Sequence, residues 1–304
     1  MKQTHLLKLL DWSSEEIFTV LDLADRLKAE NKQGKEHPVL KGKTLAMIFQ
    51  KSSTRTRVSF ETGMFQLGGH ALFLSSRDLQ IGRGEPVQDT ARVLSRYCDG
   101  IMIRTFAQQE VEDLAKFGSI PVINGLTDDY HPCQVLADLM TCREHLGQDL
   151  TGRKLCFIGD GHNMANSLAV GGLKTGMKVA IACPKGKQPL PEVLEFAKGF
   201  GDRFTFCHDP REAAADADAI FTDVWASMGQ EQEQSEREAL FAGFCVDKDL
   251  MQLAHGKCIV QHCLPAHRGE EITEEVFELH ANEIFDEAEN RLHAQKAVMA
   301  TLMA

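Results

Sequence analysis

The sequence predicts an α/β protein with two domains, each a parallel sheet flanked by helices, joined by interdomain helices. Short runs of apolar and β-branched residues alternate with stretches of helical spacing, as is typical of βαβ units. These runs fall into two series, with a polar, turn-rich break between them. The chain also has 304 residues, more than a single hydrophobic core usually supports.

The expected strands follow in chain order. The first series comprises residues 44–50, 70–74, 100–104 and 121–124. The second series comprises residues 154–159, 178–183, 203–207, 219–223 and 258–262. A helix over residues 132–146 precedes the break at 147–152, and a last helix over 287–303 follows a short apolar stretch at 283–285. We therefore expect domains over residues 1–147 and 148–284, with residues 285–304 returning as a C-terminal helix to the first domain.

Composition and charge exclude several classes of protein. With 33 basic and 44 acidic residues the net charge is −11, whereas binding to nucleic acid or anionic membranes needs a basic surface. No apolar run is long enough to span a membrane, and the N-terminus lacks the pattern of a signal peptide. The nine cysteines include no CxxC pair, so most are expected to be buried thiols. We expect a cytoplasmic protein with neither nucleic acid nor membrane as a partner.

The loop after the first strand has the composition of a phosphate-binding loop. It carries hydroxyls at Ser53, Thr54 and Thr56 and guanidinium groups at Arg55 and Arg57, and a helix follows it. Such a helix start presents free N–H groups and the positive end of the helix dipole, and arginine matches phosphate oxygens. The loop is neither a Walker loop nor glycine-rich, which disfavours a nucleoside triphosphate. A capped helix with solvated arginines would show the same pattern.

Further polar side chains end other strands or open helices of the first domain. Arg104 closes an apolar strand, where a plain surface cation is the alternative interpretation. His131 and Gln134 flank the start of the helix that opens at Pro132, a residue favoured at the first helical position. We expect both side chains to face one cleft, although a histidine that merely caps the helix is the simpler alternative.

The first strand of the second domain leads into a glycine pattern that partly resembles a dinucleotide-binding loop. The sequence from Gly159 to Met164 begins as GxGxxG but has methionine at the third glycine position. The next strand ends without the acidic residue that would bind a ribose hydroxyl. NAD binding is therefore disfavoured, and Asn163 is expected to be a polar contact at a helix start.

Two later strands of the second domain also end in candidate site residues. Asp223 follows one strand and precedes a loop of small residues, which suits an ammonium ligand or a helix cap. Cys263 and Leu264 follow the strand that ends at His262. Ligands of open parallel sheets bind at the carboxyl ends of strands, which makes these positions candidates.

These segments together resemble the transcarbamoylase family. Residues 53–57 (STRTR) resemble its carbamoyl-phosphate loop, and residues 131–134 (HPCQ) its carbonyl-polarising segment. Residues 223–229 (DVWASMG), 262–265 (HCLP) and 285–291 (FDEAENR) resemble the ornithine carbamoyltransferase branch. The five motifs occur in the family order and span nearly the whole chain.

The resemblance implies a carbamoyl-phosphate-binding domain followed by an ornithine-binding domain, and it implies roles for individual residues. The expected carbamoyl-phosphate contacts are Ser53, Thr54, Arg55, Thr56, Gln80, Arg104, His131, Gln134, Cys263, Leu264 and Arg291. Gln80 is expected to come from an adjacent subunit. The expected ornithine contacts are Asn163, Asp223, Ser227, Met228 and Cys263. The resemblance also implies a homotrimer or a multiple of trimers, with no cofactor and no metal.

The implied reaction transfers the carbamoyl group of carbamoyl phosphate to the δ-amine of L-ornithine, giving L-citrulline and phosphate. Arginine biosynthesis is the expected role, and a catabolic role that runs the reaction in reverse is the alternative. Arg55, Arg104 and Arg291 would stabilise the charge that grows on the phosphate, and His131 would donate to the carbonyl oxygen. Cys263 would position the amine without acting as a nucleophile. Putrescine, acetylornithine and aspartate carbamoyltransferases are the alternatives within the family. A catalytically inactive homologue and a nucleotide-dependent oxidoreductase are the alternatives outside it.

Overall fold

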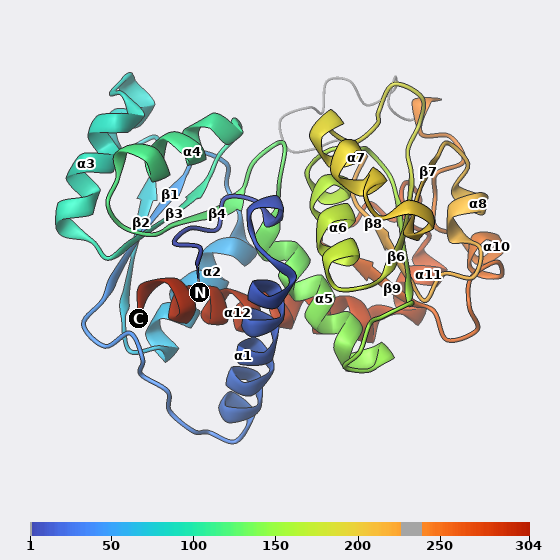
Figure 1. Cartoon of the computed structure of the whole chain (residues 1–304), viewed down its shortest axis with the longest axis horizontal. Helices are drawn as coiled ribbons and strands as arrows, with labels where there is room; N and C mark the ends of the chain where they lie inside the picture. Colours follow the sequence, from blue (N-terminus) through green and yellow to red (C-terminus); the bar gives the residue numbers. More distant parts are fainter. Residues whose placement is uncertain (1, 226–238) are drawn as a thin grey trace. The chain divides into compact units, whose positions relative to one another are not determined.

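The structure, a computed structural model, describes residues 2–225 and 239–304. The chain divides into two compact units, one formed by the chain up to Ala137 and from Asn290 onward, the other by Asp138–Glu289. Each unit is built on its own parallel sheet, with helices on both faces (Figure 1). The predicted fold class is confirmed. Both unit boundaries fall inside helices, α5 (Pro132–Leu146) and α12 (Ala281–Met303), whereas the sequence suggested boundaries at 147/148 and 284/285.

The first unit contains a four-stranded sheet in the order β2-β1-β3-β4. Figure 1 shows α3 and α4 on one side of this sheet and α2 and α12 on the other. The remaining bounds are η1 (Leu9–Asp11), α1 (Ser14–Lys32), β1 (Thr44–Phe49), α2 (Thr54–Gln66), β2 (His70–Ser75), η2 (Gln80–Arg83), α3 (Val87–Tyr97), β3 (Gly100–Arg104), α4 (Gln108–Phe117) and β4 (Val122–Leu126).

The second unit contains a five-stranded sheet in the order β7-β6-β5-β8-β9. In Figure 1, α6 and α8 cover opposite faces of it. The bounds are β5 (Lys154–Ile158), α6 (Asn163–Lys174), β6 (Lys178–Ala182), α7 (Pro191–Lys198), η3 (Gly201–Arg203), β7 (Phe204–Cys207), α8 (Pro210–Ala214), β8 (Ala219–Thr222), α10 (Lys248–Met251), β9 (Ile259–His262) and α11 (Glu274–Leu279).

Apolar side chains on both faces of the central strands form the cores. In the first unit, Ile48, Ile101 and Ile103 pack with Val111 and Leu114 of α4, and all five are fully buried. The strands are therefore continuous apolar runs, as expected for parallel strands covered on both sides. Burying each such side chain stabilises the fold by about 1.5–3 kcal/mol.

Each predicted strand is present within two residues of its expected ends. The start of the last helix was predicted wrongly: α12 begins at Ala281, six residues before the expected start at Glu287. The stretch 283–285 lies within the helix because Ile284 is a fully buried residue of the second core and its N–H bonds to the His280 carbonyl. No helix in the described part of the chain is both long and apolar enough to cross a membrane.

Candidate active site

The order of the strands places the phosphate loop at a favoured position for ligands. In the first unit the sheet grows in one direction from β1 to β2 and in the other from β1 to β3. Ligands bind at the carboxyl ends of strands where this direction changes. The loop at residues 50–53 follows β1, and Arg104 ends β3, paired in register with Phe49. The Arg104 carbonyl also accepts a hydrogen bond from the Gln50 N–H at 2.9 Å, which joins the two strand ends.

Ser53 caps the helix that follows this loop. Its hydroxyl accepts a hydrogen bond from the Thr56 N–H at 3.2 Å, and the backbone at Ser53 is extended. The cap satisfies one of the N–H groups that every helix start leaves without an intrahelical partner. The N–H groups of Thr54 and Arg55 donate to none of the residues that the structure describes. Two backbone donors thus remain at the positive end of α2, which makes it an anion-binding position.

The Arg55 guanidinium adds a full positive charge beside these donors. Its side chain is half-buried, and it forms no ion pair with any carboxylate in the described ranges. By contrast, Arg57 two residues later is paired with Glu61 at 3.0 Å. The sequence offered a capped helix as the alternative to a phosphate-binding loop. The structure has the Ser53 cap, and beside it one cation and two N–H groups that suit phosphate.

Arg291 reaches the same loop from α12. Its Nη1 donates to Gln134 Oε1 at 2.6 Å, and its Nη2 donates to Thr56 Oγ1 at 3.2 Å. Gln295 lies one turn further along α12, and its amide oxygen accepts from Arg291 Nε at 3.0 Å when it faces the guanidinium. Arg291 is 4 % exposed, so these neutral acceptors fix its orientation inside the protein.

His131 lies close to two of these cations. It is 4 % exposed, and burial, followed by the charges of Arg291 and Arg104, holds its pKa well below the usual value of 6.5. Arg104 itself is 9 % exposed. The structure therefore brings together the phosphate loop, Arg104, His131, Gln134 and Arg291. His131 is a neutral imidazole at physiological pH, so it can donate a hydrogen bond without carrying charge.

Among the predicted carbamoyl-phosphate contacts of the first unit, Gln80 is the one that the structure does not bring to this group. It opens η2 after β2, its side chain is exposed, and it donates no side-chain hydrogen bond to a residue in the described ranges. This placement is compatible with a role toward another copy of the chain.

The second unit also has its site candidates where the strand order changes direction. The sheet grows from β5 to β6 on one side and from β5 to β8 on the other. Asn163 opens α6 after β5 and is 7 % exposed, with its Oδ1 3.0 Å from His162 Nδ1. Asp223 directly follows β8 and is 9 % exposed. Both side chains thus lie at carboxyl ends of neighbouring strands.

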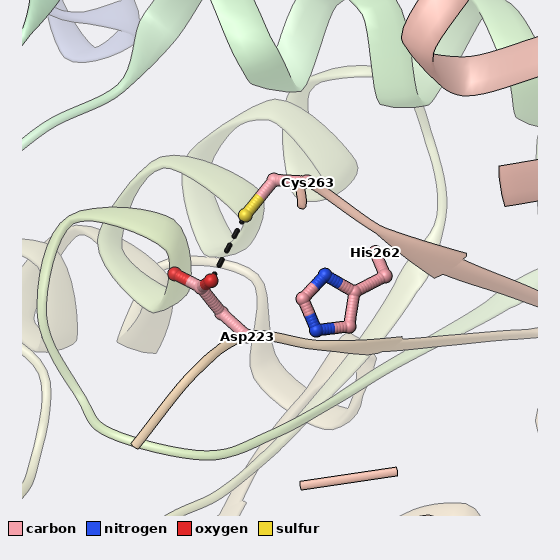
Figure 2. A group of neighbouring side chains, drawn as sticks. All are labelled: Asp223, His262 and Cys263. Atoms are coloured by element: carbon pink, nitrogen blue, oxygen red, sulfur yellow. Dashed lines mark hydrogen bonds between the residues drawn. The ribbon is translucent and has the colours of Figure 1, made fainter. Parts of the chain in front are cut away.

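Cys263 follows β9 and faces Asp223 across the pair formed by β8 and β9 (Figure 2). Its Sγ donates to Asp223 Oδ1 at 3.0 Å. Burial, and then the charge and hydrogen bond of Asp223, raise the pKa of the Cys263 thiol well above 9. Cys263 is therefore a thiol at neutral pH, and a protonated sulfur is a hydrogen-bond donor rather than an activated nucleophile.

Two residues that were not among the predicted contacts, His262 and Glu271, hold the Cys263 segment in place. His262 Nδ1 accepts from the Leu264 N–H at 2.9 Å, and His262 Nε2 lies 2.9 Å from Glu271 Oε1, with both side chains fully buried. The Glu271 oxygen also accepts from the His267 N–H at 2.6 Å. Because Nδ1 is an acceptor, Nε2 carries the proton and donates to Glu271. The position of His262, at the end of an apolar strand and next to Cys263, could have identified it from the sequence. Nothing in the local sequence distinguishes Glu271.

Leu264 adopts a left-handed backbone with φ of 58°, which is rare for a branched residue. Such conformations cost of order 1–3 kcal/mol and concentrate at functional sites. The bond from His262 to the Leu264 N–H supports this backbone. The remaining predicted ornithine contacts, Ser227 and Met228, lie outside the described residues.

The glycine pattern after β5 does not form a dinucleotide-binding loop. A Cβ on Gly161 would come within 2.1 Å of the Lys187 carbonyl oxygen, and the Gly161 N–H bonds to that oxygen at 2.9 Å. In a dinucleotide site the second glycine instead allows the pyrophosphate to approach. In this protein the backbone at Lys187 occupies the space beside Gly161 that a pyrophosphate would need.

Among the residues that the structure describes, two groups of side chains have the composition of metal ligands. Asp223, His262 and Cys263 place one ligand atom each within 4.8 Å of one another, and so do His267, Glu270 and Glu271. In the first group both ring nitrogens of His262 are engaged and Cys263 keeps its proton. The second group shares Glu271 with His262. Metal binding at either group would have to displace these contacts, so the geometry favours positioning over coordination.

The thiols are otherwise as the sequence predicted. None of the cysteines forms a disulfide, and six of them are buried: Cys98, Cys133, Cys142, Cys156, Cys183 and Cys258. Burial raises the pKa of Cys133, beside Gln134, to about 12. These buried thiols therefore act as small apolar groups.

Comparison with known proteins finds a family model for each half of the chain. The family model of the aspartate/ornithine carbamoyltransferase carbamoyl-P binding domain matches residues 4–144, and that of the Asp/Orn binding domain matches residues 151–302. An ornithine carbamoyltransferase from Syntrophotalea carbinolica is 59% identical over 97% of this chain and 98% of its own.

Solved structures are similar over the same length. Ornithine carbamoyltransferase from Pyrococcus furiosus has a TM-score of 0.93 and 53% identity, covering 98% of this chain and 96% of its own. The anabolic ornithine carbamoyltransferase from Campylobacter jejuni has a TM-score of 0.92 and 43% identity, covering 99% of each chain. The chain belongs to the aspartate/ornithine carbamoyltransferase family.

Proposed function

We propose that this enzyme transfers the carbamoyl group of carbamoyl phosphate to the δ-amine of L-ornithine, forming L-citrulline and phosphate. The observation that carries the proposal is the start of α2, where the N–H groups of Thr54 and Arg55 and the Arg55 guanidinium have no partner among the described residues. An anion with several oxygens satisfies these donors. The high identity to ornithine carbamoyltransferases supports the substrate pair.

We assign carbamoyl phosphate to the first unit. Its phosphate is held by the loop and by cations, and its carbonyl oxygen accepts from His131. The assigned contacts in this unit are Ser53, Thr54, Arg55, Thr56, Arg104, His131, Gln134 and Arg291. The depressed pKa of His131 supports its role, because a neutral imidazole donates to the carbonyl without adding a charge that would compete for the phosphate.

We assign ornithine to the second unit, with Asp223 binding the α-ammonium and Asn163 the polar end of the amino acid. Ser227 and Met228 complete the assigned set, and Cys263 and Leu264 line the reacting end. The raised pKa of the Cys263 thiol supports a positioning role, because a thiol does not compete with the substrate amine as a nucleophile. Cys263 also donates to Asp223, which orients the carboxylate.

The reaction balances without a covalent enzyme intermediate. The neutral δ-amine attacks the carbonyl carbon, a C–N bond forms, the C–O bond to phosphate breaks, and the leaving phosphate takes up the proton that the nitrogen loses. An alkyl amine is protonated at pH 7, so its pKa must fall in the site. Nearby cations stabilise the leaving phosphate, and one well-placed donor of this kind lowers the barrier by about 3 kcal/mol. Holding the amine and the carbonyl carbon in contact lowers the barrier by a further large amount.

We further propose an anabolic role in arginine biosynthesis and a homotrimer, or a multiple of trimers, in the cytoplasm. The anabolic Campylobacter jejuni relative supports the direction. Exposed apolar side chains on neighbouring elements support self-association: Phe65 of α2 is 80% exposed, and Phe73 of the edge strand β2 is 38% exposed. Gln80, which follows β2, would then reach the site of an adjacent copy. Nine free cysteines fit a reducing compartment.

Turnover with four amines tests the substrate assignment. The enzyme is expected to form product and release phosphate with ornithine, and to be much slower with putrescine, acetylornithine or aspartate. Putrescine lacks the α-ammonium and carboxylate that Asp223 and Asn163 would bind. Faster turnover with one of the other amines would replace ornithine, and absence of phosphate release with all four would contradict the enzymatic function.

A further inference from the structure

Glu110, in the first turn of α4, accepts two hydrogen bonds at the end of the first sheet. Its Oε2 accepts from Gln50 Nε2 at 3.1 Å and from the Thr105 hydroxyl. Gln50 is the first residue after β1 and opens the phosphate loop, and Thr105 is the first residue after β3 and follows Arg104. A single carboxylate oxygen therefore joins the two strand ends that carry the proposed phosphate contacts.

The backbone joins the same two strand ends. The Arg104 carbonyl accepts from the Gln50 N–H at 2.9 Å and from the Lys51 N–H at 3.4 Å. Thr105 is fully buried, and Gln50 is half-buried. The backbone bonds hold the main chain on either side of the strand ends, and the bonds to Glu110 add the side chains at positions 50 and 105. Each strand end is thus fixed twice, once by the main chain and once by Glu110.

The helix that carries Glu110 is itself held firmly on the sheet. Val111, the next residue, and Leu114 are fully buried, and they pack with Ile48 of β1 and Ile103 of β3 in the core of the first unit. Figure 1 shows α4 lying along this sheet. A side chain that projects from a packed helix holds its partners more precisely than one on a loop. The carboxylate of Glu110 is therefore a rigid support for the two strand ends.

The charge of Glu110 does not favour an anion. Glu110 forms no ion pair with a basic residue in the described part of the chain, and its carboxylate is bonded to the phosphate loop. It repels an anion bound at that loop, so Coulomb repulsion alone predicts tighter phosphate binding when the charge is removed. Any favourable contribution of Glu110 to binding has to come from the two hydrogen bonds that it accepts. Experiment can therefore separate the two effects by their sign.

We propose that Glu110 is a positioning residue for carbamoyl phosphate, which holds the phosphate loop and the segment of Arg104 at the separation that lets both contact one phosphate group. The proposal rests on the proposed function. Glu110 acts through Gln50 and Thr105 and does not touch the substrate. The role needs the acceptor oxygen of the side chain and not its negative charge. Loss of the acceptor lets the two strand ends move apart, which weakens the binding of a ligand that both must contact.

Four variants test this role. Glu110→Met removes both the acceptor and the charge, whereas Glu110→Gln removes the charge and keeps an amide oxygen as the acceptor. Thr105→Val removes one of the two donors. Glu112→Met is the matched control, because Glu112 lies on the same helix and accepts no side-chain hydrogen bond from a described residue. The readouts are the Kd of inorganic phosphate by calorimetry, kcat/KM for carbamoyl phosphate, and the KM for ornithine at saturating carbamoyl phosphate.

Glu110→Met is expected to raise the Kd of phosphate and to lower kcat/KM for carbamoyl phosphate about three- to tenfold, although it removes a repulsive charge. Glu110→Gln and Glu112→Met should bind phosphate as tightly as the wild type or more tightly. Thr105→Val should show part of the loss. The double variant with Glu110→Met and Thr105→Val should be no weaker than Glu110→Met alone, because both substitutions remove the same hydrogen bond. The KM for ornithine should stay near wild type in all of them.

Three results would overturn the positioning role. Wild-type or tighter phosphate binding by Glu110→Met would show that the charge alone matters, and an equal loss in Glu110→Gln would show that the acceptor oxygen does not. An equal rise in the KM for ornithine would indicate general damage to the fold. Phosphate binding does not depend on turnover, so failure of the wild type to form citrulline would contradict the proposed function alone.

Discussion

Arg55 is the side chain on which the phosphate assignment most depends. Replacing it with alanine is expected to lower kcat/KM for carbamoyl phosphate by about 100-fold or more, because one charge-stabilising donor contributes about 3 kcal/mol. The fold should be intact, since Arg55 forms no ion pair with a described residue. Steady-state kinetics and a thermal melt measure both effects. Near wild-type kinetics would contradict the phosphate loop as assigned.

The lowered pKa of His131 predicts how the stability of the protein depends on pH. Its pKa is well below 6.5 in the folded protein, so on acidification the unfolded chain takes up this proton first. Stability is therefore lost as the pH falls below about 6.5, by up to about 1.4 kcal/mol per pH unit from this group. His131→Gln should show a smaller loss of urea midpoint between about pH 7.5 and about pH 5.5. Equal losses in both proteins would contradict a neutral, buried His131.

At the residue level the sequence indicated candidate site residues, and the positioning residues that it missed have a common physical cause. Arg55, His131 and Asp223 stand at strand ends or helix starts, where position along the chain already implies exposure to a ligand. Glu271 and Gln295 act through side-chain hydrogen bonds to His262 and Arg291. Such partners are set by tertiary packing, so nothing in their local sequence distinguishes them from other polar residues.

At the scale of elements, the loop between β5 and α6 gives a test of the dinucleotide alternative. Gly161→Ala is expected to destabilise the protein by about 1–3 kcal/mol, because its Cβ would meet the Lys187 backbone at 2.1 Å. Gly256→Ala is the control, since that glycine has open space and no left-handed backbone. Urea denaturation measures both. A neutral Gly161→Ala, together with a melting temperature raised by NAD, would revive the nucleotide-binding interpretation.

The packing of α12 on α2 contains a buried lysine. Lys296 is fully buried and donates to Gln66 Oε1 at 2.7 Å, and burial lowers its pKa to about 8. The unfolded chain holds this proton up to about pH 10.5, so stability should rise as the pH increases from about 8 to about 10.5. Burying the charge costs stability at lower pH.

Lys296→Met is therefore expected to stabilise the protein by about 1–3 kcal/mol near pH 7 and to flatten the rise above pH 8. Lys198→Met, at an exposed position paired with Glu195, is the control and should be near neutral. Thermal or urea midpoints measured near pH 7 and above pH 8 test both expectations. A destabilised Lys296→Met variant with an unchanged pH profile would show that the ammonium is well solvated.

Strands were predictable from the sequence because parallel strands covered on both faces are continuous apolar runs, as in residues 45–48. The start of α12 was not predictable from the sequence. The apolar stretch at 283–285 is too short to show helical spacing, and acidic residues at 283 and 286–287 flank Ile284. Tertiary burial of Ile284 decides that this stretch is helical. Helix ends generally depend on such contacts more than on local composition.

For the whole molecule, the alternation of strands and helices predicted two parallel sheets, and the strand orders explain where the candidate site residues lie. Both sheets change direction beside their first strand, and the phosphate loop and Asn163 follow those two strands. The order of strands cannot be read from a single sequence, since it depends on which edges pair. The sequence therefore indicated the candidate residues, but not which strand ends are neighbours in each sheet.

The most direct test of the whole account is a crystal structure with a bisubstrate mimic that joins a phosphonate to an ornithine moiety. We expect the phosphonate on the Thr54 and Arg55 N–H groups, contacted by the Arg55, Arg104 and Arg291 guanidinium groups. We expect the α-ammonium on Asp223, with Cys263 beside the reacting nitrogen. A phosphonate bound elsewhere, with these guanidinium groups directed into solvent, would contradict the account.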